Sequence, residues 1–589
     1  MVKKILWLFI SCLMALSLII ASCGQAADGE EEGLAASSKP VYGGTLRLAT
    51  ANDILNFDPM DWVGGGPSLD LTMNRLWDGD WAKGKAGGYG TGETDWATSY
   101  DVRSHKRGYI AEDITFEVDN EKNIGRIVYK IREGVKWAKN PDSAAAVITN
   151  GRAITADDVV FSLNRCITEP KANIYRSNPA LREAIITKTG PMEVTVEVPV
   201  ERLLEAGKRF GDSTFPVPKD AIEQLGDIRD WENAVGTGPF VLTDYVLGST
   251  VTLKKNPDYW LKDPVGPGKG NDLPYLDEVK WLIIPDLSTR LAALRTGEID
   301  QYYDIHFEDA DILEETAPGL IKAVQDTVHV FPAYMRTDKE PYSNKDVRRA
   351  MMMAIDQETI ERDLYNDTGR LVTWPYYYSK AYENLYLGLD DPEMPDSVKE
   401  LFEYKPEKAK ELLDEAGYPD GFKTELICNA SQADYYSIIK EYWDAVGINL
   451  DLKVVEAGAL RSVQTGRSHE HMVCSSTGPP SIWPMLIVLT GEGWQNTSLL
   501  DDPIVNEAAA EIGRLAITDE MGAMAKTKEL MKYVQDQAWV IQNPDYPRYV
   551  MYWPWIKNYS GERSIGYFWV HSWPQFVWID EDMKSNMGH

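Results

Sequence analysis

The clearest pattern of apolar and polar positions lies in the first third of the chain. Apolar side chains alternate from Ile127 to Ile131, which predicts a strand, and the glycine of Glu133-Gly134 predicts the turn that ends it. Further on, Thr155 and Asp158 stand three residues apart, beside the apolar residues of 159–163. A hydroxyl and a carboxylate at this spacing close the first turn of a helix. The stretch therefore predicts a β-hairpin that leads into a helix.

Similar patterns predict the other elements. We expect strands at 42–50, 189–198, 240–245, 250–255, 278–284, 423–428 and 448–455. We expect helices at 219–225, 286–295, 406–416 and 433–446. Strands alternate with helices in two parts of the chain, so the predicted fold class is α/β. The body after the N-terminal segment has about 545 residues, too many for one hydrophobic core, which predicts two or three lobes.

The N-terminus carries an export signal. Two lysines precede an apolar run that ends in Ile20-Ala-Ser-Cys23, so residues 1–22 are predicted to be a signal peptide. This ending resembles a bacterial lipobox, which implies that Cys23 is lipidated; a plain signal peptide or an uncleaved anchor is the alternative. Residues 23–41, rich in Ala, Ser and acidic side chains, predict a flexible tether. We therefore expect a lipid-anchored body on the extracytoplasmic face of the bacterial cell membrane, in the periplasm or at the cell surface.

Charge and cysteine content narrow the classes of partner. The formal net charge is −31, and the pI is near 4.7, so a nucleic acid or an anionic lipid surface is repelled. Cys166, Cys428 and Cys474 have no metal-binding spacing, and we predict neither metal nor cofactor. Cys428 and Cys474 lie in predicted strands of the same lobe and are either paired or buried free thiols.

The sequence contains no convincing catalytic constellation. Ser437 and Lys440 have the spacing of a penicillin-recognising nucleophile pair, but no Lys-Thr-Gly accompanies them. His469 and His471 stand two residues apart instead of the four of a zinc-protease helix, and Gly-x-Ser-x-Gly is absent. We therefore predict that the chain is not an enzyme.

Eight short motifs, in order, resemble those of the bacterial extracellular solute-binding proteins of family 5, the dipeptide, oligopeptide and nickel type. They are Gly43-Gly-Thr-Leu46, Leu55-Asn-Phe-Asp-Pro59, Arg132-Glu-Gly-Val-Lys-Trp137, Thr155-Ala-Asp-Asp-Val-Val-Phe-Ser162, Gly236-Thr-Gly-Pro-Phe240, Asn256-Pro-Asp-Tyr-Trp260, Gly297-Glu-Ile-Asp300 and Asp346-Val-Arg-Arg-Ala350. The resemblance implies a periplasmic-binding-protein-like fold, with two lobes and three domains around a ligand cleft. It also implies a monomer that hands a small-molecule ligand to the permease of an ABC importer.

The resemblance predicts where the domains begin and end. Domain I comprises 42–76, 234–326 and 546–589, domain II comprises 77–233, and domain III, the second lobe, comprises 327–545.

The expected ligand site departs from the peptide-binding pattern. Peptide-binding members carry a Gly-Trp-x-x-Asp segment whose carboxylate pairs with the peptide amino terminus, and here Pro479 falls near that position. A buried ammonium without a counter-charge costs several kcal/mol, which disfavours a simple peptide. Arg336 occupies a position where the family carries Asn, and either binds a carboxylate of the ligand or forms a salt bridge with Asp338 or Glu340.

Aromatic residues complete the predicted ligand site. Family members carry a cleft-lining loop near residues 373–378. The candidate contacts are Trp374, Tyr376, Tyr377, Trp483 and Trp494. The function we expect is capture of a small organic solute, peptide-like or anionic or aromatic, for uptake. A ligand-sensing receptor lipoprotein without transport has the same sequence features, and an exported hydrolase is the less favoured alternative.

Overall fold

The computed structural model describes residues 39–54, 56–60, 66–97, 102–325, 330–476, 481–491, 495–567 and 571–589. The chain divides into two units, Met1–Ser38 and Lys39–His589, and the description concerns the second. The predicted signal peptide, Cys23 and most of the predicted tether therefore lie outside the described residues. Within the described residues, no helix is both long enough and apolar enough to cross a membrane.

The N-terminal part of the body is built on three larger sheets. The first has the order β1-β10-β9-β8, the second β11-β18-β12 and the third β4-β5-β7-β6. The strands are β1 (Thr45–Thr50), β4 (Ala111–Asp119), β5 (Ile124–Ile131), β6 (Ile185–Gly190), β7 (Glu193–Pro199), β8 (Phe240–Val246), β9 (Thr250–Lys255), β10 (Glu278–Ile283), β11 (Gln301–Ile305), β12 (Ile321–Gln325) and β18 (Arg548–Tyr552). Two small pairs accompany them, β2 (Trp77–Gly79) with β3 (Lys106–Gly108) and β19 (Ile556–Lys557) with β20 (Trp578–Ile579).

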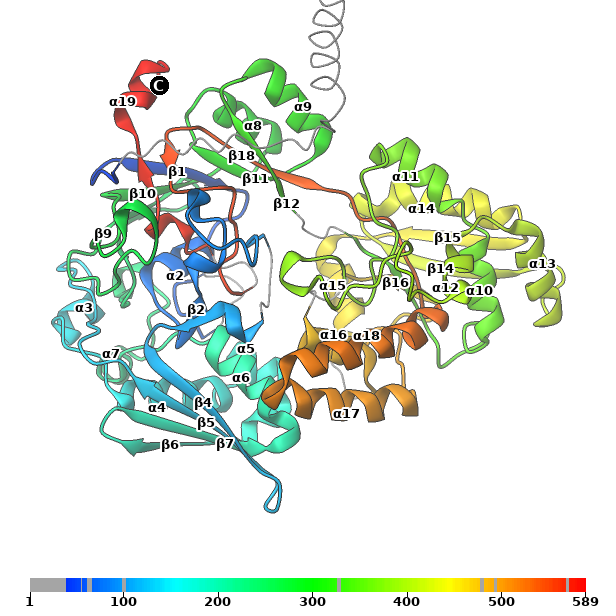
Figure 1. The fold of residues 1–589 in the computed structure, drawn as a ribbon, viewed down its shortest axis with the longest axis horizontal. Coiled ribbons are helices and arrows are strands. Elements are labelled where there is room, and N and C mark those ends of the chain that lie inside the picture. Colours follow the sequence, from blue (N-terminus) through cyan, green and yellow to red (C-terminus); the bar gives the residue numbers. More distant parts are fainter. Residues whose placement is uncertain are drawn as a thin grey trace, which may run out of the picture. The chain divides into compact units, whose positions relative to one another are not determined.

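Short helices surround these sheets. They are α2 (Gly66–Thr72), α3 (Ala144–Thr149), α4 (Ala156–Thr168), α5 (Asn173–Ser177), α6 (Leu203–Asp212), α7 (Lys219–Leu225), α8 (Leu287–Arg295), α9 (Phe307–Thr316) and α19 (Glu581–Asn586). We call this part lobe 1; it comprises the described residues up to 325 and from 546 onward (Figure 1).

Lobe 2 comprises the described residues of 330–545. Its sheet has the order β15-β14-β16-β13-β17, formed by β13 (Ala333–Met335), β14 (Phe422–Cys428), β15 (Ile448–Val454), β16 (Met472–Cys474) and β17 (Val540–Ile541). Its helices are α10 (Lys345–Met353), α11 (Gln357–Tyr365), α12 (Asp396–Lys399), α13 (Pro406–Glu415), α14 (Ala430–Asp444), α15 (Ala457–Gly466), α16 (Ile482–Leu489), α17 (Pro503–Thr518) and α18 (Glu520–Asp536). Figure 1 shows α17 and α18 lying side by side.

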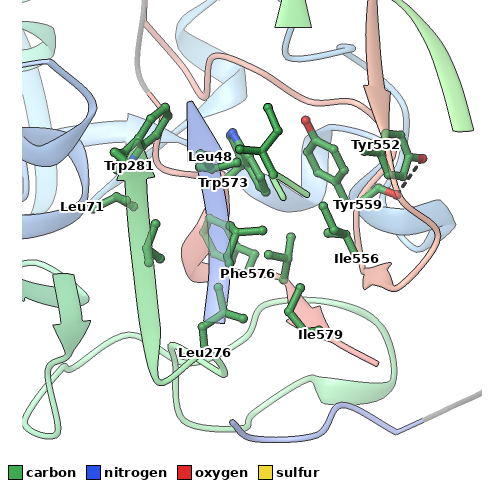
Figure 2. Packing of buried hydrophobic residues seen from close by; sticks show 14 of the residues in the cluster. Leu48, Leu71, Leu276, Trp281, Tyr552, Ile556, Tyr559, Trp573, Phe576 and Ile579 are labelled. Carbon is green, nitrogen blue, oxygen red and sulfur yellow. Dashed lines mark hydrogen bonds between the residues drawn. The ribbon is translucent and has the colours of Figure 1, made fainter. Parts of the chain in front are cut away.

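Separate hydrophobic clusters stabilise the sheets. In lobe 1, the C-terminal segment returns to cover β1 and β10, and Trp573 and Phe576 pack near Leu48 and Trp281 (Figure 2). A second cluster lies between α4 and the β4-β5-β7-β6 sheet, and a third fills lobe 2. Because each cluster draws on residues far apart in sequence, each lobe is held together by long-range contacts.

Most predicted elements are confirmed. The strands expected at 240–245 and 250–255 become β8 and β9 in antiparallel pairing, and the second β–α–β unit becomes β14, α14 and β15, with its strands parallel. The hairpin expected from Ile127 onward is wrong, because β5 pairs with β4 and β7 and the segment after its turn bridges from Lys136 to Ala153 instead. Helix α7 has the predicted bounds. The predicted strand 189–198 is wrong in its first part, because the chain turns at Pro191-Met192 and residues 189–190 belong to β6. Proline lacks the amide hydrogen that a continuous strand needs there.

The predicted helix start at Thr155 is confirmed in detail. The Thr155 hydroxyl and the Asp158 carboxylate form a reciprocal capping box at the start of α4. Both Asp158 oxygens also accept from the Arg152 guanidinium at 2.8 Å, and one accepts from the Lys219 amide at 3.1 Å. Asp158 is 1% exposed. One carboxylate therefore ties a turn, α4 and the start of α7 together.

We expect Asp158→Ala to destabilise lobe 1 by about 3 kcal/mol, because it removes the helix cap and leaves buried donors unpaired. Asp157→Ala is the matched control: Asp157 is exposed and pairs with Lys188 on the surface, so its loss costs less than about 1 kcal/mol. Urea unfolding followed by tryptophan fluorescence measures both. Equal midpoints for the two variants would contradict the role given to Asp158.

Candidate functional site

Helix α6 brings charged side chains into the interior of the protein. A Cβ atom on Gly211 would lie 2.4 Å from the Nε1 atom of Trp77, and Gly207 is similarly close to a ring on β4. The two glycines, one helical turn apart, therefore let α6 lie against the strands of lobe 1. This close approach buries Arg209 and Asp212, which are 5% and 1% exposed.

Two other buried cations next to α6 are neutralised by carboxylates. The Lys106 ammonium pairs with Asp212, and Arg75 pairs with Asp70 at 2.7 Å and with Asp78 at 3.8 Å. Burial raises the pKa of Asp70 and raises that of Asp78 to about 7, against the lowering effect of Arg75. The network shows that charge inside lobe 1 is usually matched by opposite charge.

Arg209 has no such partner. Among the described residues, no carboxylate lies within ion-pair distance of its guanidinium, and its buried Nε atom donates to no acceptor. The guanidinium carbon instead lies 5.0 Å from the centre of the Trp483 ring, and Trp483 is 6% exposed. This is a cation–π contact between α6 of lobe 1 and α16 of lobe 2.

The first turn of α16 surrounds this contact. Ser481 is the N-cap residue, but its hydroxyl caps no backbone amide. The Ser481 Oγ atom is buried and has no hydrogen-bond partner in the described part of the chain. Trp483 is the second residue of α16, so the Arg209 cation lies at a helix end where amide hydrogens are free and the partial charge is positive.

Other contacts between the lobes lie close by. The Arg103 amide donates to both carboxylate oxygens of Glu520, at 3.1 Å each, and its Nη2 atom donates to the Ile517 carbonyl at 2.9 Å. Helix α6 lies beside α17 (Figure 1). A groove of about 290 Å³ lies along the same seam and is lined by Val118, Asn120, Val200, Glu511, Arg514, Leu515, Ile517 and Thr518.

The structure places Arg336 in the salt bridge that the sequence offered as one of two roles. Its Nε and Nη2 atoms donate to the two oxygens of Asp338, at 2.7 and 2.8 Å, and its Nη1 atom donates to the His469 carbonyl at 2.6 Å. The pairing lowers the pKa of Asp338 below its ordinary value. A carboxylate already neutralises this guanidinium, and its contact with a ligand stays a prediction.

Three of the predicted aromatic contacts lie buried in lobe 2. Trp374 and Tyr376 belong to a hydrophobic cluster that also contains the first residue of α16. The Trp374 indole donates to the Tyr334 hydroxyl at 3.0 Å, and that hydroxyl donates to the Ser476 carbonyl at 3.2 Å. Tyr377 is 4% exposed. Their contact with a ligand also stays a prediction.

Trp483 contacts lobe 1 through Arg209, and the cluster that holds Trp374 and Tyr376 also contains Val102 of lobe 1. Trp494 and Pro479 lie outside the described residues. Sequence reasoning missed Arg209. The available signal was the pair of glycines four residues apart, flanking Lys208-Arg209, because such spacing predicts a helix face that packs closely and buries its neighbours.

Cys428 and Cys474 lie in hydrogen-bond contact with each other. Cys166, Cys428 and Cys474 are buried free thiols. Over the described ranges, no group of three His, Cys, Asp or Glu side chains is placed to hold a metal ion.

Comparison with known proteins places this geometry in context. Residues 107–489 match the sequence model described as bacterial extracellular solute-binding proteins, family 5 middle. The glutathione-binding protein GsiB of Shigella boydii serotype 4 (strain Sb227) is 26% identical over 471 residues, which cover 77% of this chain and 82% of that protein.

Two solved structures share the fold. The periplasmic binding protein DppA from Helicobacter pylori, an ABC transporter-associated protein in complex with the peptide STSA, has a TM-score of 0.66 at 20% identity and covers 92% of this chain and 99% of its own. HbpA2 from Haemophilus parasuis has a TM-score of 0.68 at 20% identity and covers 91% of this chain and 100% of its own.

Glu562 anchors the segment that meets Lys106. Its carboxylate accepts from the amides of Ala86 and Ser560, at 2.7 Å each, and Lys106 donates to the Gly566 carbonyl of the same segment. Glu562 is fully buried, and burial raises the pKa of its carboxyl to about 7.

This shift predicts a pH dependence of stability. The unfolded chain ionises Glu562 from about pH 4.5 upward, whereas the folded protein keeps it protonated up to about pH 7, so stability is highest below pH 4.5 and is lost as pH rises through 7. Relative to Glu562→Gln, which does not titrate there, we expect the free energy of unfolding of the wild type to fall by about 3 kcal/mol across this window. The measurement is the free energy of unfolding in denaturant, as a function of pH, for the wild type and Glu562→Gln. Parallel curves for the two proteins would contradict this prediction.

Proposed function

Because the chain belongs to the bacterial extracellular solute-binding proteins of family 5, we propose that it is the membrane-tethered solute-binding component of an ABC-type importer. It captures a small organic solute between its two lobes and delivers it to the permease in the membrane. The relatives are extracytoplasmic binding proteins and not enzymes, which supports a binding role and disfavours an exported hydrolase.

The observation that carries this proposal is the buried contact between Arg209 and Trp483. It joins a charged residue of lobe 1 to an aromatic residue of lobe 2, and both are almost fully removed from water. Polar interactions strengthen in such a dry, low-dielectric seam, which is what a protein needs to hold a small polar solute. Closure on the solute is a population shift toward the form in which the lobes meet.

Peptide-like anions are the favoured class of solute. Relatives are named for binding glutathione or were solved with a bound peptide, and both kinds of ligand carry a carboxylate. The missing Asp of the Gly-Trp-x-x-Asp segment argues against a site that depends on a free ammonium. We place the ligand among Arg336, Trp374, Tyr376, Tyr377, Trp483 and Trp494, within the three-domain division expected from the sequence.

The alternative function is that of a ligand-sensing receptor without transport. Both functions need the same two lobes and the same solute site. The genomic neighbourhood separates them, because an importer requires permease genes and a receptor does not. We propose a monomer, held at the extracytoplasmic face of the membrane by a lipid on Cys23.

Native mass spectrometry of the full chain, extracted in mild detergent, tests solute capture. We expect an additional mass in the folded protein that is lost on denaturation, because a solute enclosed between lobes dissociates slowly. The mass identifies the solute. A bare protein that also shows no thermal shift with peptides or organic acids would count against capture.

Replacing Cys23 tests the anchor. In a bacterial host, we expect Cys23→Ser to move the protein from the membrane fraction to the soluble extracytoplasmic fraction, since the thiol that carries the lipid is gone. Cys12→Ser, in the same N-terminal segment, is the matched control and should stay membrane-bound. If Cys23→Ser also remains in the membrane, the segment is an uncleaved anchor.

A further inference from the structure

Arg209 is a buried positive charge that pairs with no carboxylate of the described residues. Each neighbouring cation of the network has a carboxylate, Lys106 with Asp212 and Arg75 with Asp70 and Asp78. Asp212 stands one helical turn from Arg209; its Oδ1 atom pairs with Lys106, and its buried Oδ2 atom has no hydrogen-bond partner among the described residues. An ion without a counter-charge in contact is destabilised when it leaves water, and a cation–π contact offsets only part of this cost. The three cations and three carboxylates of the network balance in number, but no carboxylate is paired with Arg209.

The Arg209 guanidinium carbon lies 5.0 Å from the centre of the Trp483 ring. Hydrogen bonds to a guanidinium form in its plane, at the N–H edges. The Nε–H donor is buried and has no acceptor in the described part of the chain. A carboxylate matches an in-plane pair of N–H donors in the bidentate manner typical of arginine.

The start of α16 supplies a second, independent set of donors, the Ser481 hydroxyl and the amides of Ile482 and Trp483; Pro484, the third residue of the helix, has no amide hydrogen. Ser481 is 2% exposed and its hydroxyl has no partner among the described residues. Helix N-termini attract anions because their first amide hydrogens lack acceptors. Trp483, two residues after Ser481, brings this turn next to Arg209.

We propose that Arg209 of lobe 1 and the first turn of α16 in lobe 2 form one subsite for a carboxylate of the captured solute. The subsite rests on the proposed function and refines it: the preferred solute is an organic carboxylate, and its anionic end bridges the lobes. Arg336 differs, because Asp338 already provides its counter-charge.

Matched pairs of probes test the subsite. The full chain, stripped of any retained solute by dialysis against denaturant and refolded, is titrated by calorimetry with trialanine and trialaninamide, and with reduced glutathione and its diamide. We expect the wild type to prefer the carboxylate of at least one pair by about ten- to hundred-fold, the range for a charge-assisted hydrogen bond. Arg209→Gln should reduce this preference to about two-fold or less.

Three further variants sharpen the test. Arg209→Lys keeps the positive charge but loses the planar pair of N–H donors, so we expect an intermediate preference for the carboxylate probe. If Arg209→Gln does not fold, this variant provides the test of the subsite. Arg126→Gln removes a lobe 1 guanidinium that pairs with Glu197 on the surface, and should leave the preference unchanged. Trp483→Leu should weaken carboxylate and amide probes alike, because it removes the packing surface and not the charge.

The outcomes separate this inference from the proposed function. A wild type that binds probes while Arg209→Gln keeps the full carboxylate preference overturns the subsite alone. Loss of the preference in Arg336→Gln but not in Arg209→Gln assigns the anion to Arg336 and also overturns it. A wild type that binds no probe and retains no solute after purification overturns both proposals.

Discussion

A buried charge without a carboxylate partner lies where the two lobes meet. The interior of lobe 1 holds several cations, and most of them form ion pairs with carboxylates, such as Lys106 with Asp212. Arg209 instead contacts an aromatic ring of the other lobe. Because a cation–π contact offsets only part of the desolvation cost, the closed arrangement of the lobes is stable only to the extent that something else offsets the rest.

The two arginines of the site show how sequence spacing decides which charge is left over. Arg336 and Asp338 stand two residues apart in the turn that follows β13, which the Lys339 amide closes on the Arg336 carbonyl, so a bidentate pair forms locally. Arg209 has Asp212 at helical spacing, but Lys106, from a distant strand, takes that carboxylate. A tertiary contact thus leaves Arg209 free for a ligand, while a local contact fixes Arg336.

Much of the fold was predictable because its signals are local. The capping box at Thr155, the hairpin of β8 and β9, and the β14–α14–β15 unit are each specified within about 30 residues. The strand expected at 189–198 was misplaced where one proline outweighed a regular alternation. No helix was expected at α6, α16, α17 or α18. Helices α16, α17 and α18 pack mainly against one another, whereas α6 packs against β2, β5 and α17.

The candidate site was less predictable for the same reason. Trp483 was proposed from the sequence, but its partner Arg209 is far away along the chain, and no alternation or motif links the two. Trp374 and Tyr376 were chosen as aromatic residues in an expected loop, whereas the structure packs them into the cluster beneath α16. A single sequence shows which residues are aromatic or charged, but burial and unmatched charge appear only when distant segments meet.

An unmatched charge at the seam also gives selectivity without a tight pocket. A neutral solute of the right shape leaves the Arg209 guanidinium buried and uncompensated, so it cannot offset the cost of bringing the lobes together. An anion does so only when both lobes contribute, because Arg209 and the first turn of α16 belong to different lobes. Its differential affinity for the closed form is what shifts the population toward closure. The preference for anionic over neutral solutes and the closure of the two lobes then both follow from the need of Arg209 for a counter-charge.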